Sequence, residues 1–376
     1  MTAGAEQAPT KPLVLLAAGG TGGHLFPAEA LAEALARRGV IIDLATDHRA
    51  ERYGHRFPAR SIHIVASETL RGRDPISLAR TAVMLGIGAV QALRLIGRAK
   101  PAAVVGFGGY PTIPPVMAAT LRNIPTVIHE QNAVMGRANR FLAPRVGAIA
   151  TSFAGVLDRV PKLNVKATRT GNPVRAMVIA AATQPYVGPD STSVLRILAF
   201  GGSQGARIMA DIVPAAVERL EPQVRRRLAV VQQAREEDLA RVKEFYAQAA
   251  VAAEVAPFFA DLPARIAGAH LIISRSGAST VAELTAIGRP AILVPLPHAL
   301  DQDQSANAAV LENAGGAIRM PQDDFTSERL AKEIRALASA PAKLVAMAAA
   351  ARAQGAVDAA ERLADLVEKT MAKGQR

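Results

Sequence analysis

Two glycine-rich turns could hold an anion. Gly19 to Gly23 (GGTGG) follows the apolar run at residues 11–18, and Gly201 to Gly205 (GGSQG) follows the apolar run at residues 195–200. Each turn leads into a segment with apolar residues at helical spacing. Glycine at a strand-to-helix turn lets backbone N–H groups approach a phosphate, and the helix N-terminus adds about half a positive charge. Both turns are therefore predicted phosphate sites.

Neither turn fits a common nucleotide motif. The dinucleotide pattern G-x-G-x-x-G starting at Gly20 fails because Leu25 occupies the place of its third glycine, although Asp43 stands where a ribose-binding carboxylate would lie. The P-loop pattern fails because no Gly-Lys-Ser/Thr follows either turn. A dehydrogenase and a purely structural turn remain as alternatives at this point.

Three polar clusters follow apolar strand-like runs further along the chain. They are residues 129–132 (HEQN), residues 275–283 (RSGASTVAE), and His298 with residues 301–304 (DQDQ). Helix capping would explain one such cluster, but repetition at several strand ends favours a polar-ligand site. Asp301 and Asp303 could share a divalent cation. We favour capping by Asp301 of a helix through residues 306–313.

The elements that position these residues alternate between strand and helix. Strands are predicted at residues 11–18, 40–44, 102–107, 126–129, 195–200, 271–274 and 291–294, and helices follow both glycine turns. This order predicts two doubly wound α/β domains with parallel sheets. Such sheets bind ligands at the carboxyl ends of their strands, so two facing edges would form a cleft. We place the domains at 11–172 and 173–354, with a last helix at about 355–372.

Composition narrows the classes of function. Residues 1–175 hold 22 Lys and Arg against 10 Asp and Glu, whereas residues 176–376 hold 22 of each, so the first half carries the whole net charge of +12. The chain has no Cys, which excludes disulfides and thiolate chemistry. No basic patch is interleaved with aromatic residues, so nucleic acid is not the expected partner. Residues 1–10 are predicted to be a loose tail without a signal peptide.

Residues 70–100 combine apolar and basic side chains. Ile76, Val83, Met84, Ile87, Val90 and Leu93 form the apolar face, flanked by Arg71, Arg73, Arg80, Arg94, Arg98 and Lys100. Such a helix can lie on an anionic bilayer, or it can be a core helix with solvated basic ends. A membrane span is not expected, because Gln91 and Arg94 interrupt the run well short of about 20 residues.

Taken together, the motifs resemble the MurG family of N-acetylglucosaminyltransferases. The matching segments occur in family order over roughly residues 13–320: 19–24, 108–110, 129–132 with Gly136, 171–175, 201–205, 275–283 and 301–308. The resemblance implies the GT-B fold, with two Rossmann-like domains facing across a cleft and the final helix crossing back to the first domain. It also implies an inverting, metal-independent transfer without a cofactor.

The substrates implied by the resemblance are UDP-N-acetylglucosamine and lipid I, with lipid II as the product for peptidoglycan. Further implied are an anionic membrane surface bound through about residues 70–100, peripheral attachment at the cytoplasmic face of the inner membrane, and contacts with other cell-wall synthesis proteins. A different UDP-sugar transferase, a UDP-N-acetylglucosamine epimerase, and a basic nucleotide- or nucleic-acid-binding module are the alternatives.

Roles carried over from the family place the donor between the two halves. Asn132 would hold the sugar, Arg175 and Ser203 the diphosphate, and Glu283 the ribose hydroxyls. Phe259 matches a position near uracil where the family usually has an aliphatic residue. The full set of expected substrate-binding residues is Thr21, Gly22, Gly23, Tyr110, His129, Asn132, Arg175, Ser203, Gln204, Gly205, Phe259, Ala278, Ser279, Thr280, Val281, Ala282, Glu283 and Gln304.

The reaction itself requires a base. Inversion is an in-line displacement in which the departing UDP gains negative charge, and the attacking 4-hydroxyl of the muramoyl sugar must lose a proton. His24 is the first candidate because it ends the first glycine turn, although it could instead only hydrogen-bond that loop. Glu130 and His129 are the reserve candidates, and Asn132 is counted with the catalytic set.

Overall fold

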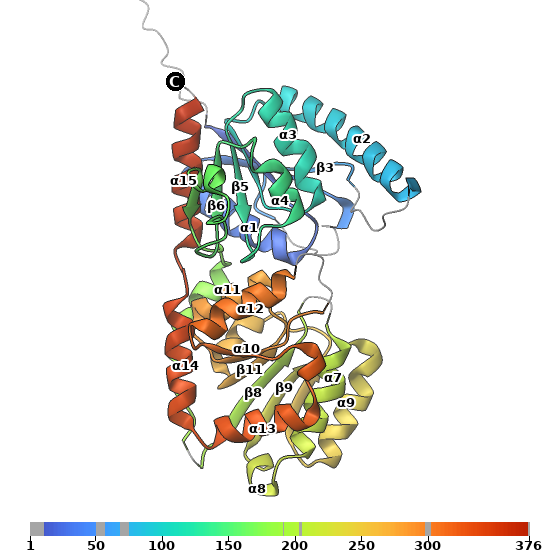
Figure 1. The fold of residues 1–376 in the computed structure, drawn as a ribbon, viewed down its shortest axis with the longest axis vertical. Helices are drawn as coiled ribbons and strands as arrows, with labels where there is room; N and C mark the ends of the chain where they lie inside the picture. Colours follow the sequence, from blue (N-terminus) through green and yellow to red (C-terminus); the bar gives the residue numbers. More distant parts are fainter. Residues whose placement is uncertain are drawn as a thin grey trace, which may run out of the picture.

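The computed structural model describes residues 11–49, 57–67, 75–190, 192–202, 205–297 and 302–374, and side chains in 75–78 are not described. Two parallel sheets lie one beyond the other along the long axis (Figure 1). One has the strand order β3-β2-β1-β4-β5-β6-β7 and the other β10-β9-β8-β11-β12-β13. In each sheet the order reverses beside its first strand, which is the doubly wound arrangement. The expected fold class is confirmed.

The first sheet is built from short apolar runs separated by helices. Its strands are β1 Leu13–Ala17, β2 Ile41–Thr46, β3 Ser61–Ile64, β4 Ala103–Gly106, β5 Thr126–Glu130, β6 Ala148–Thr151 and β7 Ala167–Arg169. The helices are α1 Gly22–Arg37, α2 Pro75–Ala99, η2 Tyr110–Thr112, α3 Ile113–Leu121, α4 Arg137–Leu142 and α5 Pro161–Asn164. β1 is buried along its whole length because helices cover both faces of the sheet.

The second sheet repeats this plan. Its strands are β8 Leu195–Phe200, β9 Leu228–Gln233, β10 Ala252–Ala256, β11 Leu271–Ser274, β12 Ala291–Leu293 and β13 Ala317–Arg319. Its helices are α6 Ala176–Ala182, α7 Arg207–Glu218, α8 Pro222–Arg225, α9 Glu236–Gln248, α10 Leu262–Gly268, α11 Ala278–Ile287, α12 Asp303–Asn313, η3 Gln322–Asp324, α13 Ser327–Ala338 and α14 Pro341–Ala353. Each sheet has apolar clusters on both of its faces.

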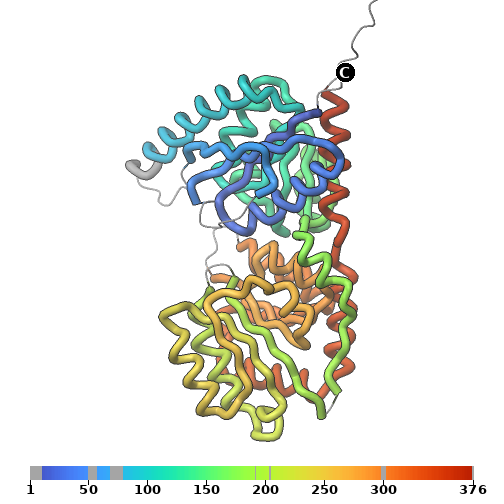
Figure 2. Tube along the Cα trace, turned by 180° about the vertical axis from the view of Figure 1, so that it is seen from behind, coloured from blue at the N-terminus to red at the C-terminus, as the bar shows by residue number. Residues whose placement is uncertain are grey.

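The last helix, α15 Ala359–Gly374, leaves the second half and packs on the first (Figures 1 and 2). Its buried Leu363 and Val367 join the same apolar cluster as Leu31 of α1. Arg38, just after α1, donates to three carboxylates of α15, those of Glu361, Asp365 and Glu368. These contacts attach the end of the chain to its first helix.

The strand β5 runs further than its apolar run suggests. His129 and Glu130 are still paired with β6, opposite Ala150 and Thr151. Both side chains therefore start inside the sheet, where neighbouring elements bury them.

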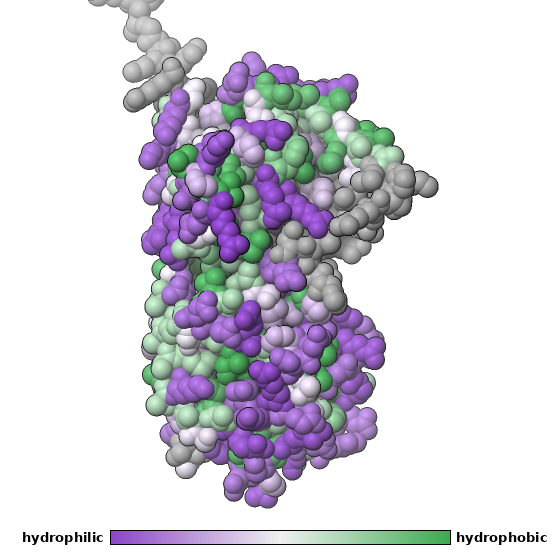
Figure 3. All heavy atoms as spheres, viewed as in Figure 1, coloured by the Kyte–Doolittle hydropathy of each residue, from purple (hydrophilic) through white to green (hydrophobic). Residues whose placement is uncertain are grey.

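The helix α2 is more apolar than the sequence pattern suggested. Its segment Ala79–Ala99 is long and apolar enough to cross a membrane by length and composition alone, and little of it is buried in the fold (Figure 3). The expectation that no segment reaches this length was therefore too strict, since Gln91 and Arg94 lie within an otherwise apolar helix. In the fold, α2 packs along α3. Val83, Ile87 and Val90 remain 61%, 46% and 48% exposed.

Candidate active site

Loops at the carboxyl ends of both sheets meet between the two halves. Asn132 follows β5 in the first half, and Asn307 lies on α12 of the second. The Asn307 Nδ2 donates to Asn132 Oδ1 at 3.0 Å and to the Ser276 carbonyl at 3.2 Å, and its Oδ1 accepts from the Ala133 N–H at 2.8 Å. Asn307 is fully buried. One amide side chain therefore joins the polar clusters after β5 and β11.

The first glycine turn surrounds the imidazole of His24. A side chain on Gly19 would come within 3.2 Å of the ring, and one on Gly109 within 3.4 Å. The ring is thus held between the turns after β1 and β4. Thr112 keeps these turns together, because its hydroxyl donates to the Gly108 carbonyl at 2.6 Å and is 3.2 Å from the Ala17 carbonyl.

The protonation state of His24 suits a base. The residue is half-buried, and its Nδ1 is buried without a hydrogen bond to the described protein. Burial lowers the pKa of His24, while the backbone of Phe107 and the side chain of Gln131 oppose the shift. The imidazole is therefore neutral at pH 7 and able to accept a proton.

Glu130 is a positioning residue in this structure. Its Oε1 accepts from the Asn132 N–H at 3.0 Å, and its Oε2 accepts from the Gly136 N–H at 3.0 Å and from Asn139 Nδ2 at 2.8 Å. Burial raises the pKa of Glu130, and these hydrogen bonds oppose the rise. Protein donors therefore hold both oxygens in place in this structure, and the predicted catalytic role of Glu130 stays a prediction. Glu130 shapes the loop that presents Asn132.

His129 is likewise used inside the protein. Its Nε2 lies 2.9 Å from the Gly171 carbonyl, and its Nδ1 lies 3.0 Å from Gln131 Nε2. The residue is fully buried, which lowers its pKa to about 4. Both ring nitrogens lie within hydrogen-bond distance of protein atoms, and the expected substrate contact of His129 and its place as a reserve base stay predictions. His129 ties β5 to the start of the connector between the halves.

Arg175, Glu283 and Phe26 form a second contact between the halves. The Arg175 guanidinium lies 3.9 Å from the centre of the Phe26 ring, and its Nη2 lies 3.4 Å from Glu283 Oε1. Burial raises the pKa of Glu283, and Arg175 opposes that rise. The two residues expected to bind diphosphate and ribose are thus neighbours, paired with each other.

The N-terminus of α11 lies beside this pair. Gly277 caps the helix with an extended backbone and no side-chain capping hydrogen bond, so N–H groups of its first turn lack a partner within the helix. Ser279 and Thr280 are half-buried there, as is Ala282, whereas Ala278 and Val281 face the core. Among the expected binding residues 278–283, two face the core, three are half-buried, and Glu283 is buried beside Arg175.

Buried polar atoms without protein partners gather around these loops. Among the described residues they include His24 Nδ1, both amide atoms of Asn172, Arg175 Nε and Ser279 Oγ. Buried polar groups in native proteins are almost always hydrogen-bonded to protein, water or ligand. Their concentration where the two halves meet indicates a polar ligand site.

The remaining expected residues differ in how they are presented. Gly205 follows β8 with a positive φ of 66°, and Tyr110 begins η2. The Gln304 side chain accepts from the Leu296 N–H at 3.0 Å. Phe259 is buried under Arg265, while its neighbour Phe258 is 65% exposed. Ser203, Gln204, His298 and Asp301 lie outside the described residues.

Of the two aspartates that could share a cation, only Asp303 lies in the described residues. The Asp303 Oδ1 accepts from the Gln304 N–H at 2.8 Å in the first turn of α12. No group of three potential metal ligands occurs within the described parts of the chain. The described half of the pair therefore acts at the helix start.

Three residues of this site were not selected from the sequence. Asn307 and Phe26 both contact residues of the other half, and Asn172 is buried with unpartnered amide atoms. Asn172 carried a signal, because it sits in the Gly-Asn-Pro connector. Asn307 lies within the family-matching segment 301–308, whereas Phe26 lies at an ordinary helical position, so only the packing of the halves reveals its role.

Gly23 provides a prediction about ligand approach. A side chain there would meet nothing within 4 Å, and its φ is not positive, so the protein alone does not require glycine in this helix. Alanine is favoured over glycine in a helix by about 1 kcal/mol. We expect Gly23→Ala to keep or raise the melting temperature while lowering glycosyl transfer at least tenfold.

The control for Gly23→Ala is Gly86→Ala in α2, where a side chain also meets nothing within 4 Å. It should give the same stability effect and full activity. Melting curves and initial rates on both variants test this. Normal rates for Gly23→Ala would show that no ligand closely approaches the start of α1.

Comparisons with known proteins agree with this geometry. The model described as "Glycosyltransferase family 28 N-terminal domain" matches residues 14–151, and "Glycosyltransferase family 28 C-terminal domain" matches residues 196–363. The chain is 63% identical to a Rhodopseudomonas palustris (strain BisB18) protein over 95% of this chain and 96% of that one. A Nitrobacter winogradskyi protein is 62% identical over 97% and 99%. Both are named UDP-N-acetylglucosamine--N-acetylmuramyl-(pentapeptide) pyrophosphoryl-undecaprenol N-acetylglucosamine transferase.

A solved structure, Acinetobacter baumannii MurG, superposes with a TM-score of 0.77 at 29% identity, covering 95% of this chain and 99% of the other. Two facing doubly wound halves with glycine turns at their shared edge define a GT-B glycosyltransferase. The chain belongs to glycosyltransferase family 28.

Proposed function

We propose that this chain transfers N-acetylglucosamine from UDP-N-acetylglucosamine to the muramoyl 4-hydroxyl of lipid I, forming lipid II for peptidoglycan. The observation that carries the proposal is full-length identity above 60% to relatives named for this transfer. The second half, residues 173–354, takes the donor. The first half, residues 11–172 together with α15, takes the acceptor.

The donor is held from both sides of the cleft. Arg175 leaves Glu283 to bind the diphosphate, and Glu283 then accepts from the ribose hydroxyls. This exchange keeps each buried charge partnered. The N–H groups at the start of α11 line the uridine site. Thr21, Gly22 and Gly23 contribute the start of α1 to the sugar and diphosphate, with Asn132 on the sugar. Ser203, Gln204, Gly205, Gln304 and Tyr110 complete the expected binding set.

The transfer inverts the anomeric carbon without a metal or cofactor. Negative charge grows on the departing UDP, where Arg175 and oriented helix N-termini stabilise it. His24 takes the proton of the attacking hydroxyl, supported by its neutral ring beside the first glycine turn. Glu130 and His129 act through the loop that carries Asn132.

The enzyme attaches peripherally to the cytoplasmic face of the inner membrane, where its lipid acceptor lies. Support comes from the exposed Val83, Ile87 and Val90 on α2 and from the basic first half. Anionic vesicles should sediment the protein and neutral ones should not. Equal binding to both kinds of vesicle would contradict the electrostatic contribution to membrane attachment. Contacts with other cell-wall synthesis proteins are part of the same proposal.

UDP release tests the reaction. The protein is incubated with UDP-N-acetylglucosamine, with and without a lipid I analogue, and UDP and the disaccharide lipid are measured. We expect acceptor-dependent release with one disaccharide formed per UDP. Release without acceptor would indicate epimerase or hydrolase chemistry, and no release with acceptor would contradict the transferase assignment.

A further inference from the structure

The side chain of Gln131 lies between the two histidines His24 and His129. Gln131 directly follows β5 and is buried. A side chain on Gly108, in the turn after β4, would lie 3.4 Å from His24 Cε1 and 3.6 Å from Gln131 Oε1. The amide oxygen of Gln131 and the imidazole of His24 therefore border the same small space.

His129 fixes the direction in which the Gln131 amide points. The His129 Nε2 lies 2.9 Å from the Gly171 carbonyl, which only accepts, so this nitrogen carries the ring proton. Burial lowers the pKa of His129 to about 4, so the ring is neutral and its Nδ1 accepts from Gln131 Nε2 at 3.0 Å. Gln131 Nε2 also donates to the His129 carbonyl at 3.1 Å. Two acceptors thus hold the NH₂ end of the amide, and the Oε1 end is turned toward His24.

This orientation bears on which nitrogen of His24 carries the proton. An amide oxygen accepts a hydrogen bond and cannot donate one. The Gln131 side chain and the Phe107 backbone both raise the pKa of His24, as acceptors of a ring N–H do. Nδ1 is the buried nitrogen of His24, and its contacts fall short of a hydrogen bond in the free protein. Hydrogen bonds of catalytic groups often tighten only when substrate is bound.

Two charged residues also act on His24, and their effects oppose each other. Arg49 lowers the pKa of His24, whereas Asp47 raises it. The two are paired after β2, with Arg49 Nε 3.0 Å from Asp47 Oδ2. Because these charges offset each other, the neutral acceptors decide which ring nitrogen is protonated.

We propose that Gln131 is a positioning residue for the transfer: its amide oxygen, oriented by His129, keeps the proton of His24 on Nδ1 and leaves the Nε2 lone pair for the acceptor. This inference rests on the proposed role of His24 as the base and deepens it. The attacking hydroxyl gives its proton to Nε2, its oxygen bonds to the anomeric carbon, and UDP leaves with the electron pair. The imidazolium that forms has an N–H on each nitrogen, and Gln131 Oε1 stabilises the one on Nδ1.

Nitrogen-15 spectra of protein labelled at histidine read the tautomer directly, because protonated and unprotonated ring nitrogens resonate far apart. Spectra are recorded at about pH 8, above the ordinary histidine pKa of about 6.5. The signals of His24 are those missing from His24→Ala. We expect the proton of His24 on Nδ1 in the wild type. A proton on Nε2 would overturn the proposal without any measurement of activity.

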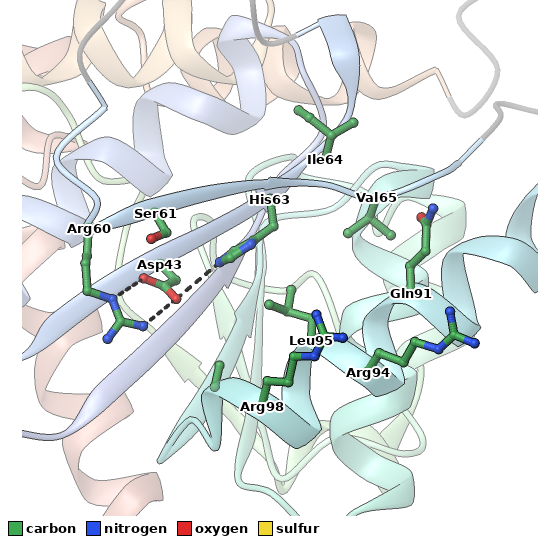
Figure 4. A pocket seen from close by; sticks show the side chains of 11 residues that line it. Asp43, Arg60, Ser61, His63, Ile64, Val65, Gln91, Arg94, Leu95 and Arg98 are labelled. Carbon is green, nitrogen blue, oxygen red and sulfur yellow. Dashed lines mark hydrogen bonds and ion pairs between the residues drawn. The ribbon is translucent and has the colours of Figure 1, made fainter.

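His63 supplies an internal reference with the opposite tautomer. Its Nε2 lies 3.3 Å from Asp43 Oδ2 (Figure 4). Hydrogen bonds from Arg60 and His63 lower the pKa of Asp43, so its carboxylate is ionised and only accepts. The neutral ring of His63 therefore carries its proton on Nε2, and its spectrum should differ from that of His24.

Gln131→Met removes the amide oxygen at similar side-chain length. We expect kcat to fall about 10- to 100-fold, the range for partners that fix a histidine tautomer. The KM for UDP-N-acetylglucosamine should be unchanged, because no contact with the donor is removed. The His24 signals should show both tautomers. Initial rates, melting curves and nitrogen-15 spectra are measured on the same preparations.

The matched control is Gln232→Met in β9 of the second half. Gln232 is fully buried, its Nε2 donates to the Met209 carbonyl at 3.0 Å, and its Oε1 accepts from the Tyr246 hydroxyl. This variant removes an equally buried amide from a different core. It should lose melting temperature as Gln131→Met does, while kcat and the His24 signals stay as in the wild type.

The outcomes separate this proposal from the one on which it rests. Normal turnover in His24→Ala would refute the base and the role of Gln131 with it. If His24→Ala is inactive but Gln131→Met keeps the kcat and tautomer of the wild type, the base stands and the proposal for Gln131 is overturned. Equal losses of kcat in Gln131→Met and Gln232→Met would assign the effect to stability and also overturn it. If Gln131→Met does not fold, the wild-type tautomer decides.

Discussion

Replacing His24 by alanine should lower turnover about 10²- to 10⁴-fold, the range expected for loss of a general base, while UDP affinity changes by less than about threefold. The imidazole lies between the glycine turns after β1 and β4 and is neutral because burial lowers its pKa. Turnover is measured as disaccharide lipid formed at saturating substrates, and UDP affinity by calorimetry.

The pH profile gives an independent readout for His24. Because the pKa of His24 is lowered from 6.5, the active neutral form persists through pH 7 and is lost only as the pH falls below that value. The acidic limb of kcat should therefore lie below pH 6.5 in the wild type and be absent in His24→Ala. A collapse of UDP affinity with normal turnover per bound donor would instead make His24 a donor ligand.

Replacing Arg175 by glutamine should lower kcat about 10²- to 10³-fold, as removal of a donor that stabilises developing charge does, and should also weaken UDP binding. The guanidinium already lies against the cleft, stacked on Phe26 and 3.4 Å from Glu283. Rates at saturating UDP-N-acetylglucosamine and UDP titrations measure the two effects. Arg175→Lys keeps the charge without the forked geometry, so its kcat should lie between those of the wild type and of Arg175→Gln.

Glu283 supplies the control for Arg175. Arg175→Gln leaves the buried Glu283 carboxylate without its cationic neighbour, so part of the damage is to stability. The R175Q/E283Q double variant should recover the melting temperature and remain inactive. Recovery of activity in that double variant would show that Arg175 serves only to neutralise Glu283.

The parallel strands and the two glycine turns could be predicted because their signals are local. β8 and β11 occupy residues 195–200 and 271–274 as expected, since each apolar run is bounded by turn-forming residues. β5 was harder, because His129 and Glu130 are polar and buried by neighbouring elements. Polarity alone does not show whether such a residue faces a ligand or holds a loop.

The contacts between the halves could not be predicted from local pattern. Asn307 reaches Ala133 across 174 residues of chain, and Arg175 reaches Phe26 only because the two halves pack in this orientation. Phe258 and Phe259 also show the limit of local pattern, since these adjacent identical residues have opposite exposure. The domain limits at residues 172 and 354 stay predictions.

The packing of α15 on α1 has a consequence for how the protein is made. The first half needs the helix Ala359–Gly374 to cover the apolar face of α1, yet that helix is synthesised only after the second half. Nearly 190 residues lie between the end of the first half at residue 172 and the start of α15 at residue 359. At about 5–20 residues per second, α15 is therefore made roughly 10–40 s after the first half. During that interval the ribosome carries a first half whose apolar α1 residues are not covered by α15, beside a second half that can already fold. The N-terminal half, although first in the chain, should be the last to become protease-resistant during translation.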